Sequence, residues 1–241
     1  MMMNKKLLAV AEEYLGKGGK DPRKFCGLSG SAPWCNAFIC FVFSKAGMSK
    51  LYYGGKKVTY CPTSVKWCDA NLAMVPIYLA LPSDVIYFDW NNNGVPDHVG
   101  FVEKKISTEK IRTIEGNTNG GIVAKKTRPE RYVLGVYRPH FSAKFNAGKK
   151  LKVDGAFGYN TIAVMQKAFG LKVDGVLKKS DIKALQNRAG VRQDGSWGPA
   201  TSKAVQKMIR SAASGAFAVD GEFGPKSVKT MQIWLNERVF K

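Results

Sequence analysis

A short motif built around Asp-Gly occurs four times after residue 150. The copies begin at residues 153, 173, 193 and 219, and three of them continue into an aromatic residue and a glycine. A glutamine follows each Asp by twelve residues, and apolar residues recur between them at helical spacing. Each copy therefore predicts a turn, a tight loop and a short amphipathic helix. Such a unit cannot bury its own apolar face, so the four must pack on one another.

Several positions of the repeats carry more specific expectations. A residue able to cap a helix follows each Asp by seven positions. Lys178 replaces the glycine of the other copies, so we expect an altered turn or a lost ligand contact in the second unit. The aromatic residues can stack on sugar rings or fill the core, and their regular spacing favours the core for at least two of them. The cap candidates are Thr161, Asp181, Thr201 and Ser227, the glutamines are Gln166, Gln186, Gln206 and Gln232, and the aromatics are Phe157, Trp197, Phe223 and Trp234.

The first 140 residues have a different pattern, in which helical periodicity comes first and strand periodicity follows. This order predicts an α+β fold with N-terminal helices and an antiparallel sheet. We expect domains at 1–141 and 150–241, joined by a linker at 142–149, the second being small and all-α. The predicted helices lie at 4–15, 35–46 and 64–74, and the predicted strands at 85–88, 99–103, 111–115 and 133–138.

The chain is strongly basic, with a net charge of +20 over 241 residues. Lysines and arginines are spread over both halves, which predicts a polyanionic partner such as nucleic acid, an anionic membrane or an anionic cell wall. No arginine-rich arm or RNA-binding aromatic motif favours nucleic acid. No segment is long enough to insert into a membrane, and no signal peptide is evident, so we expect synthesis in the cytoplasm.

Cys35 lies where a loop rich in glycine and serine gives way to an apolar, helix-length run. A cysteine in the first turn of a helix is stabilised as a thiolate by unpaired N–H groups and the helix dipole. A buried structural cysteine is the alternative. The chain has five cysteines, no CxxC pair and only two histidines, which argues against structural zinc.

A cysteine hydrolase also needs an imidazole and a polar group that orients it. His98 opens a predicted strand after a loop, and Glu115 and Asn117 lie two apart at the end of the next strand. Alternate residues of a strand share a face, so both can point toward one site. His98 alone would more simply be a hydrogen-bonded structural histidine.

The segments PWCNAFICFVF, DHVGFVE and TIEGNT resemble those of CHAP domains, in the same order and spacing. The resemblance implies a papain-like hydrolase of peptidoglycan over residues 1 to about 140. In it Cys35 would be the nucleophile, His98 the general base and acid, Glu115 the group that orients the imidazole, and Asn117 a polar support. The repeats after about residue 148 resemble peptidoglycan-binding repeats, which implies wall binding.

Two segments depart from the CHAP pattern. Trp34 stands where many members have Gln, which leaves the second oxyanion donor unassigned among Ser29, Ser31 and Asn36. The acidic calcium loop that some members have upstream of the cysteine is absent. Together with the aromatics of the repeats, Trp34 is a candidate for contact with substrate.

A different calcium site is conceivable in the loop that leads to His98. Its oxygen-bearing residues have the spacing of an EF-hand loop, but Gly100 stands where the bidentate Glu would be. An Asx-rich turn is the alternative, and no cofactor is otherwise required. The four candidate ligands are Asp89, Asn91, Asn93 and Asp97.

These observations together predict a cell-wall lytic cysteine hydrolase that cuts an amide bond in peptidoglycan. The bond is either the N-acetylmuramoyl-L-alanine amide or a stem or cross-bridge peptide bond. The expected setting is that of a phage endolysin, which acts on the wall after release, with peptidoglycan and anionic wall polymers as partners. The alternatives are an exported bacterial autolysin, a non-catalytic wall-binding protein and a nucleic-acid-binding protein.

Overall fold

The chain divides into two units, each with its own packing, in a computed structural model that describes residues 3–107, 109–141 and 147–240. The first unit comprises residues up to 72 and 80–141, and the second comprises 73–79 together with the chain after 141. Residues 73–79, expected in the first domain, thus cluster with the second. Part of the expected linker, 142–146, lies outside the described residues.

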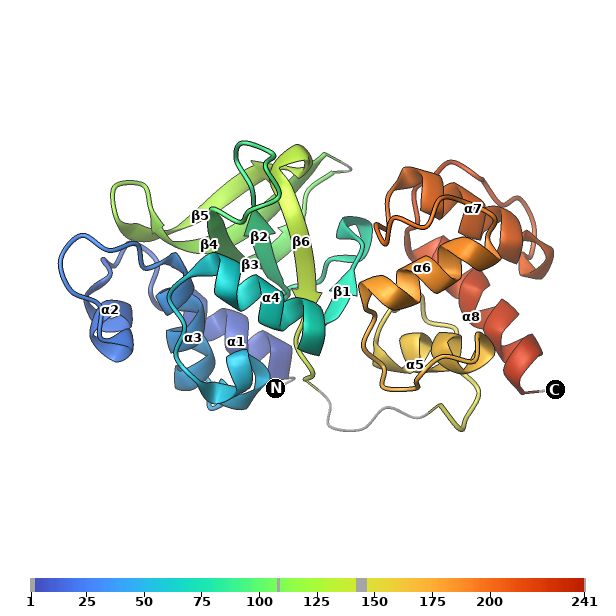
Figure 1. The fold of residues 1–241 in the computed structure, drawn as a ribbon, viewed down its shortest axis with the longest axis horizontal. Helices are drawn as coiled ribbons and strands as arrows, with labels where there is room; N and C mark the ends of the chain where they lie inside the picture. Colours follow the sequence, from blue (N-terminus) through green and yellow to red (C-terminus); the bar gives the residue numbers. More distant parts are fainter. Residues whose placement is uncertain (1–2, 108, 142–146, 241) are drawn as a thin grey trace. The chain divides into compact units, whose positions relative to one another are not determined.

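The first unit is α+β, as its sequence pattern predicts. Figure 1 shows α1, α3 and α4 grouped beside a sheet. Its helices are α1 (Met3–Glu12), α2 (Lys20–Cys26), α3 (Cys35–Lys45) and α4 (Cys61–Asn71), and its strands are β2 (Val85–Phe88), β3 (His98–Lys105), β4 (Lys110–Thr118), β5 (Ile122–Pro129) and β6 (Val133–Arg138).

Helix α3 is the central helix of this unit because its sequence is apolar on every side. All nine residues from Cys35 to Phe43 are buried. The ring centroids of Phe38 and Phe43 lie 6.3 and 5.7 Å from that of Phe101 on β3. A helix that is hydrophobic all round is stable only inside a core, so α3 is held firmly against the sheet.

The sheet of the first unit has the strand order β6-β2-β3-β4-β5. The short strand β1 (Ala73–Val75) belongs to the second unit. The pairs β2–β3, β2–β6, β3–β4 and β4–β5 are all antiparallel. The register pairs Phe88 with His98, so the end of β2 meets the start of β3. A register irregularity between Glu115 and Thr118 interrupts the pairing of β4 with β5.

Four elements differ from the sequence-based expectation. Helix α2 and strands β1 and β5 were not predicted, and α4 spans Cys61–Asn71 instead of 64–74. Helix α2 is a short, polar KDPRKFC segment. Strand β5 carries Lys125, Lys126 and Arg128 among its eight residues, and such a charged composition is typical of the edge strand that it is. Helix α4 starts early because Pro62 is favourable in a first helical turn.

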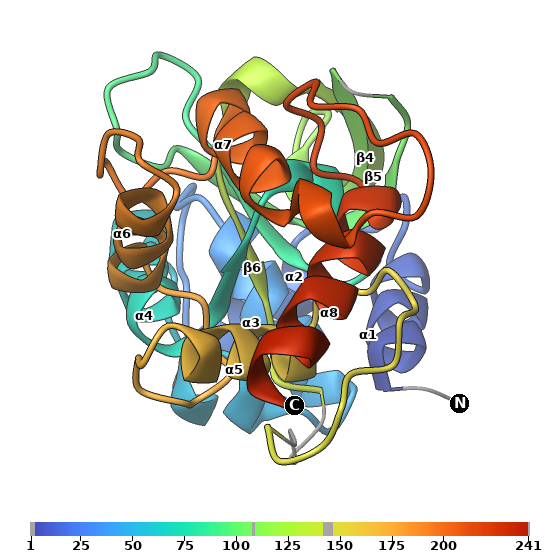
Figure 2. The same ribbon diagram turned by 90° about the vertical axis from the view of Figure 1, so that its right-hand side faces the viewer.

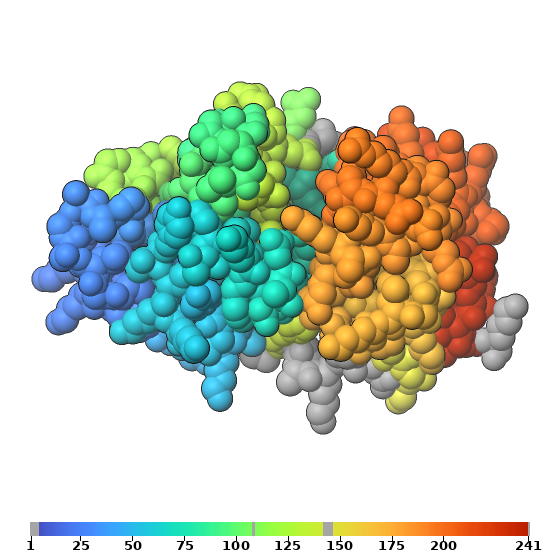
Figure 3. Space-filling view, viewed as in Figure 1, coloured from blue at the N-terminus to red at the C-terminus, as the bar shows by residue number. Residues whose placement is uncertain are grey.

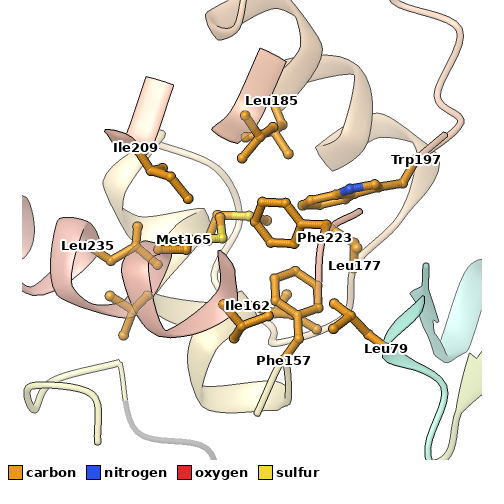
Figure 4. Packing of buried hydrophobic residues seen from close by; sticks show 14 of the residues in the cluster. Leu79, Phe157, Ile162, Met165, Leu177, Leu185, Trp197, Ile209, Phe223 and Leu235 are labelled. Atoms are coloured by element: carbon orange, nitrogen blue, oxygen red, sulfur yellow. The ribbon is translucent and has the colours of Figure 1, made fainter. Parts of the chain in front are cut away.

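The second unit contains α5 (Tyr159–Ala168), α6 (Lys179–Arg188), α7 (Pro199–Ile209) and α8 (Pro225–Val239). The residue three positions after each repeat Asp lies at the centre of its core (Figure 4). These residues are Phe157, Leu177, Trp197 and Phe223. The Trp197 ring centroid lies 5.4 Å from that of Phe157 and 5.3 Å from that of Phe223. Figure 3 shows side chains of this unit closing over the core on the visible face.

The glutamine of each repeat binds the Asp-Gly turn of the next repeat. Gln166 Oε1 accepts the N–H groups of Asp174 and Gly175, and Gln186 and Gln206 accept the glycine N–H of the third and fourth turns. Gln232 then returns to the first turn, where it accepts the N–H groups of Asp154 and Gly155. Figure 2 shows α5 to α8 following one another around this unit. The four turns and four glutamines therefore form a closed cycle.

Two expectations about the repeats are wrong in detail. The predicted cap residues occupy the third position of each helix, where Thr161, for example, accepts a hydrogen bond from Gln232. The cap positions themselves hold Gly158, Lys178, Gly198 and Gly224. Lys178 does not disturb its turn, because φ is −106° there and any residue adopts such extended backbone. Its N–H donates to Asp181, and its ammonium group pairs with Asp174 at 2.9 Å.

None of the helices in the described part of the chain combines the length and hydrophobicity that a membrane span requires.

Candidate active site

Cys35 is the first residue of α3 and is 4% exposed. The first intrahelical hydrogen bond runs from Phe38 N–H to Trp34 C=O, so the N–H groups of Cys35 and Asn36 have no intrahelical acceptor. The Asn36 N–H instead interacts with the Cys35 sulfur. Cys35 therefore lies in the first turn of a helix, as the sequence predicts. This location favours the thiolate form of the cysteine.

His98 is the first residue of β3 and is 8% exposed. Its imidazole lies beside the Cys35 thiol, so that each group shifts the pKa of the other, although the two residues are 63 positions apart. Its Nε2 lies 2.9 Å from Glu115 Oε2. The rings of Phe88 and Trp90 pack beside it, at centroid distances of 6.3 and 6.0 Å. The imidazole is thus fixed at its Nε2 edge and along its face.

Glu115 on β4 is fully buried and is surrounded by donors. Besides His98, Thr113 Oγ1 donates to its Oε1 at 2.6 Å. Space for the carboxylate comes from Gly100 on β3, where a Cβ would lie 2.7 Å from the Glu115 Cγ. Cys35, His98 and Glu115 therefore form one connected group, as the spacing of the three motifs suggests.

Arg128 is a member of this group that the sequence analysis missed. Its Nε donates to Glu115 Oε1 at 2.9 Å, and its Nη2 donates to Oε2 at 2.5 Å. The guanidinium carbon also lies 4.8 Å from the centroid of the Trp90 ring. Arg128 belongs to β5, the strand that was not predicted, and nothing in its local sequence marks it as a partner of Glu115.

The electrostatics of the group favour a thiolate and an imidazolium. A hydrogen bond from Cys61 is the largest influence on Cys35; with His98 it outweighs burial and holds the pKa of Cys35 well below its usual value. Burial acts to lower the pKa of His98, but the bonds to Cys35 and Glu115 raise it to about 9. Burial opposes the ionisation of Glu115, yet Arg128 and His98 lower its pKa to about 2.

Cys61 is a second residue that the sequence analysis did not place at the site. It begins α4, and its Sγ lies 3.7 Å from that of Cys35. A Cys-Pro pair at the start of a helix was the available signal, but the helix was expected to begin three residues later. The site therefore holds two thiols.

A buried polar network lies behind the nucleophile and fixes Asn36. The Asn36 Nδ2 donates to Ser64 Oγ at 2.9 Å, and its Oδ1 accepts from the Tyr52 hydroxyl at 2.5 Å. Tyr87 joins the same network through Tyr52 and Ser64. Asn36 is fully buried and its amide is occupied, so it is a structural residue and not a free oxyanion donor. Ser29 and Ser31, the other candidates, are exposed residues of the preceding loop.

Trp34 does not have the exposure expected of a substrate contact. It is 3% exposed, and its ring lies where Cβ atoms at Gly19 and Gly116 would be, within 2.4 and 2.7 Å. The ring thus packs the start of α2 against β4. Trp34 is a packing residue that fixes the position of its neighbour, Cys35.

The Asn117 side chain is not joined by hydrogen bonds to the other site residues that the structure describes. Asn117 has a φ of 58° and lies within the irregular part of β4, so the alternation that would align it with Glu115 does not continue. It is half-buried, and no hydrogen bond from its side chain to Cys35, His98 or Glu115 is found among the described residues. Its supporting role stays a prediction.

The loop at 89–97 folds around its own oxygen atoms. Asp89 accepts the N–H groups of Asn91, Asn93 and Gly94, Asn93 accepts that of Val95, and Asp97 accepts that of Trp90. These are the bonds of an Asx-rich turn, and they occupy oxygens that a calcium ion would need. In the described residues, no three His, Cys, Asp or Glu side chains converge in a way that could hold a metal.

The four aromatic residues of the repeats that were candidates for substrate contact are all core residues. Their exposed fractions range from 0 to 8%, which leaves no ring face for a sugar. The expectation that they contact substrate is therefore wrong, because the regular spacing places them where the repeats pack together. The four residues are Phe157, Trp197, Phe223 and Trp234.

Comparison with known proteins gives no family for this chain. No protein-family model matches it, and no curated protein sequence matches it significantly. Its chemistry must therefore be argued from the group formed by Cys35, His98 and Glu115. A thiolate beside an oriented imidazolium is suited to nucleophilic acyl transfer.

Proposed function

We propose that this protein is a cysteine hydrolase that cuts an amide bond in bacterial peptidoglycan. The observation that carries the proposal is the group of Cys35, His98 and Glu115, in which the imidazole lies beside the thiol and is bonded to the carboxylate. A papain-like fold for the first unit and a wall-binding role for the second belong to the same proposal.

The mechanism follows from the protonation states that the site favours. The Cys35 thiolate attacks the carbonyl carbon of the amide, and the Cys35 N–H at the start of α3 is available to the oxyanion that forms. His98 gives its proton to the leaving nitrogen, the C–N bond breaks, and a thioester remains. The neutral imidazole then takes a proton from water, which attacks the thioester and releases a carboxylate. Glu115 keeps the imidazole oriented throughout.

The identity of the substrate rests on charge and on resemblance. A net charge of +20, spread over both units, favours a polyanionic surface such as a wall that bears anionic polymers. The motifs around the three site residues resemble those of peptidoglycan hydrolases, and the repeats resemble wall-binding repeats. No observation favours one amide bond of the wall over another.

Clearing of purified cell-wall sacculi tests the proposal directly. The wild-type chain should lower the turbidity of the suspension, and Cys35→Ala should not. Cys26→Ala is the matched control, because Cys26 is a half-buried thiol that does not contact His98. Mass spectrometry of the released fragments identifies the bond, since an amidase frees lactyl-muramic ends and an endopeptidase creates new peptide N-termini.

Two outcomes would contradict the proposal in different ways. Sedimentation of the protein with sacculi, without clearing beyond that of Cys35→Ala, would favour a non-catalytic wall-binding protein. Retention on DNA with no retention on sacculi would favour a nucleic-acid-binding protein.

A further inference from the structure

The nucleophile candidate faces a second thiol that the hydrolytic mechanism does not use. Cys61 Sγ lies 3.7 Å from Cys35 Sγ, and the two residues are 26 positions apart. Each is the first residue of a helix, Cys35 of α3 and Cys61 of α4, and each is buried. Acyl transfer needs one sulfur, so the second requires its own explanation.

The remaining thiols have different surroundings. Cys68 interacts with the Tyr87 hydroxyl, and Cys40 donates to the Val58 carbonyl at 3.3 Å. Cys26 and Cys40 also interact with each other, but neither contacts an imidazole. Among the described cysteines, Cys35 and Cys61 form the thiol pair in which one member also lies beside a histidine.

The two sulfurs of this pair have unequal acidity. The bond from Cys61 lowers the pKa of Cys35, whereas the same bond and burial raise the pKa of Cys61. Cys35 is therefore the thiolate and Cys61 the thiol that donates to it. Thiolates are the form of cysteine that peroxides oxidise.

We propose that Cys61 is a resolving cysteine, which converts peroxide-oxidised Cys35 into a reversible Cys35–Cys61 disulfide. The Cys35 thiolate attacks one oxygen of hydrogen peroxide, the O–O bond breaks, and a sulfenic acid and hydroxide form. The Cys61 sulfur then attacks the sulfenic sulfur and the S–O bond breaks. The departing hydroxide takes the Cys61 proton as water. The hydroxide of the first step takes up the proton that Cys35 lost on ionisation, so two thiols and one peroxide give one disulfide and two waters.

The geometry permits this step with small movements. A disulfide has an S–S length of about 2.05 Å, so the sulfurs must approach by about 1.6 Å. Both side chains are at helix starts, where a rotation about χ1 breaks no helical hydrogen bond. The resulting disulfide would prevent further oxidation of Cys35 to sulfinic acid, which cells rarely reverse. A dithiol reductant would restore both thiols by exchange.

Peptide mapping of the full chain tests the proposal without any measurement of hydrolysis. The protein is treated with hydrogen peroxide, free thiols are blocked with iodoacetamide, and the chain is digested with trypsin without reductant. Cys61 falls in the peptide 58–66, whereas Cys35 shares the peptide 25–45 with Cys26 and Cys40. We expect these peptides to be cross-linked, with fragment ions that assign the link to Cys35, and dithiothreitol to release them.

The variants Cys61→Ser and Cys61→Ala should lose this protection. In both, Cys35 should gain two oxygen atoms and stay unreactive to iodoacetamide after dithiothreitol, whereas most wild-type Cys35 should recover. Cys26→Ala should form the Cys35–Cys61 link as the wild type does. Circular dichroism establishes whether each variant is folded. The peptide map of the wild-type chain tests the proposal even if neither Cys61 variant folds.

Formation of sulfinic acid at wild-type Cys35 with no link to Cys61 would overturn the proposal. Equal recovery of Cys35 in wild type and in a folded Cys61 variant would do the same. The proposal rests on the proposed nucleophile, yet the two fail separately. If the disulfide forms but the protein does not clear sacculi, only the proposed hydrolase activity is contradicted. If the protein clears sacculi but no disulfide forms, only the role of Cys61 as a resolving cysteine is contradicted.

Discussion

Arg128 binds both carboxylate oxygens of Glu115, through Nε at 2.9 Å and Nη2 at 2.5 Å. This fork leaves the carboxylate one orientation, in which Oε2 also meets His98. A planar guanidinium provides two parallel donors that a lysine cannot reproduce. Arg128 therefore acts on the reaction through Glu115, as a positioning residue.

Replacement of Arg128 by Met should slow the hydrolysis and change its pH dependence. Hydrogen bonds to charged groups contribute about 1.5–3 kcal/mol, so we expect the rate to fall about tenfold or more. Loss of a nearby cation also favours the imidazolium, so the alkaline limb of the pH–rate profile should move upward. Turbidity assays over a pH series measure both effects.

Arg112→Met is the control for this change, because Arg112 on β4 pairs with Glu103 at 3.7 Å and is 40% exposed. Arg128→Lys should recover only part of the rate, since it keeps the charge without the fork. Equal rates and profiles for Arg128→Met and Arg112→Met would show that Arg128 has no positioning role.

The reactivity of Cys35 should have the pH dependence expected of a thiolate that is paired with the His98 imidazolium. Its lowered pKa keeps the thiolate present at neutral pH, and the raised pKa of His98 keeps the imidazolium present up to about 9. Alkylation of Cys35 by iodoacetamide should therefore be fast at pH 6 to 7 and slow only in more acidic solution. Hydrolysis, which also needs the imidazolium, should decline as pH rises through about 9.

Alkylation rates are obtained by mass spectrometry of the Cys35 peptide after timed exposure. His98→Gln removes the imidazolium, so the same experiment on this variant should give a slower rate at neutral pH. A wild-type alkylation rate that increases with a midpoint near 9 would identify Cys35 as an ordinary thiol.

Replacement of Gln232 by Ala should loosen the second unit at the joint between its last and first repeats. Gln232 is 1% exposed and also donates to Asp154, Ala156 and Thr161. Each buried polar group left unpaired costs about 1–3 kcal/mol, so we expect a loss of about 2–4 kcal/mol in the free energy of opening.

Hydrogen exchange of peptides that span the first turn and α8 measures this loss locally. Gln206→Ala removes the same kind of contact at the joint between α7 and the fourth turn and should have a similar effect there. Gln193→Ala is the control, because Gln193 makes an exposed bond to Asn187. Unchanged exchange at residues 154–156 in Gln232→Ala would contradict the closed cycle.

Gly100→Ala should displace the Glu115 side chain and so impair the site. The added methyl would lie 2.7 Å from Glu115 Cγ and 3.1 Å from the Ile114 oxygen. Overpacking of this kind costs about 1–3 kcal/mol of stability, and here it also displaces the carboxylate from His98. We expect slower clearing of sacculi and slower alkylation of Cys35 at neutral pH.

Gly18→Ala is the matched change in the same unit, since its new methyl would meet only the Gly121 oxygen, at 3.8 Å. Clearing and alkylation by this variant should equal those of the wild type. If Gly100→Ala also retains the wild-type rates of clearing and alkylation, neither rate depends on the present position of Glu115.

The elements that the sequence predicts well are those with a strong apolar pattern. The run from Cys35 to Phe43 is buried on all sides, and β2 is buried along its length. Helix α2 and strand β5 lack such a pattern because one is short and polar and the other is a charged edge strand. Their backbones are determined by neighbours that are distant in the sequence.

The same limit applies to the candidate site. Cys35, His98 and Glu115 stand in motifs that could be recognised one by one. Arg128 could not be recognised, since its role depends on the pairing of β5 with β4, which places Ala124 opposite Glu115. The aromatic residues of the repeats could not be assigned by type alone, because a core and a sugar site require the same side chains.

The return of Gln232 to the first turn has a consequence for how such a unit can change in size. An open array of repeats has end units with a polar outer face and can lengthen by duplication. Here each unit has a neighbour on both sides, so none serves as an end cap. Insertion of a fifth copy, or deletion of one, would change the number of units in the ring and so break the joint that Gln232 makes with the first turn. Changes that keep all four joints, such as new termini placed within an exposed loop between copies, are the ones that this arrangement should accept.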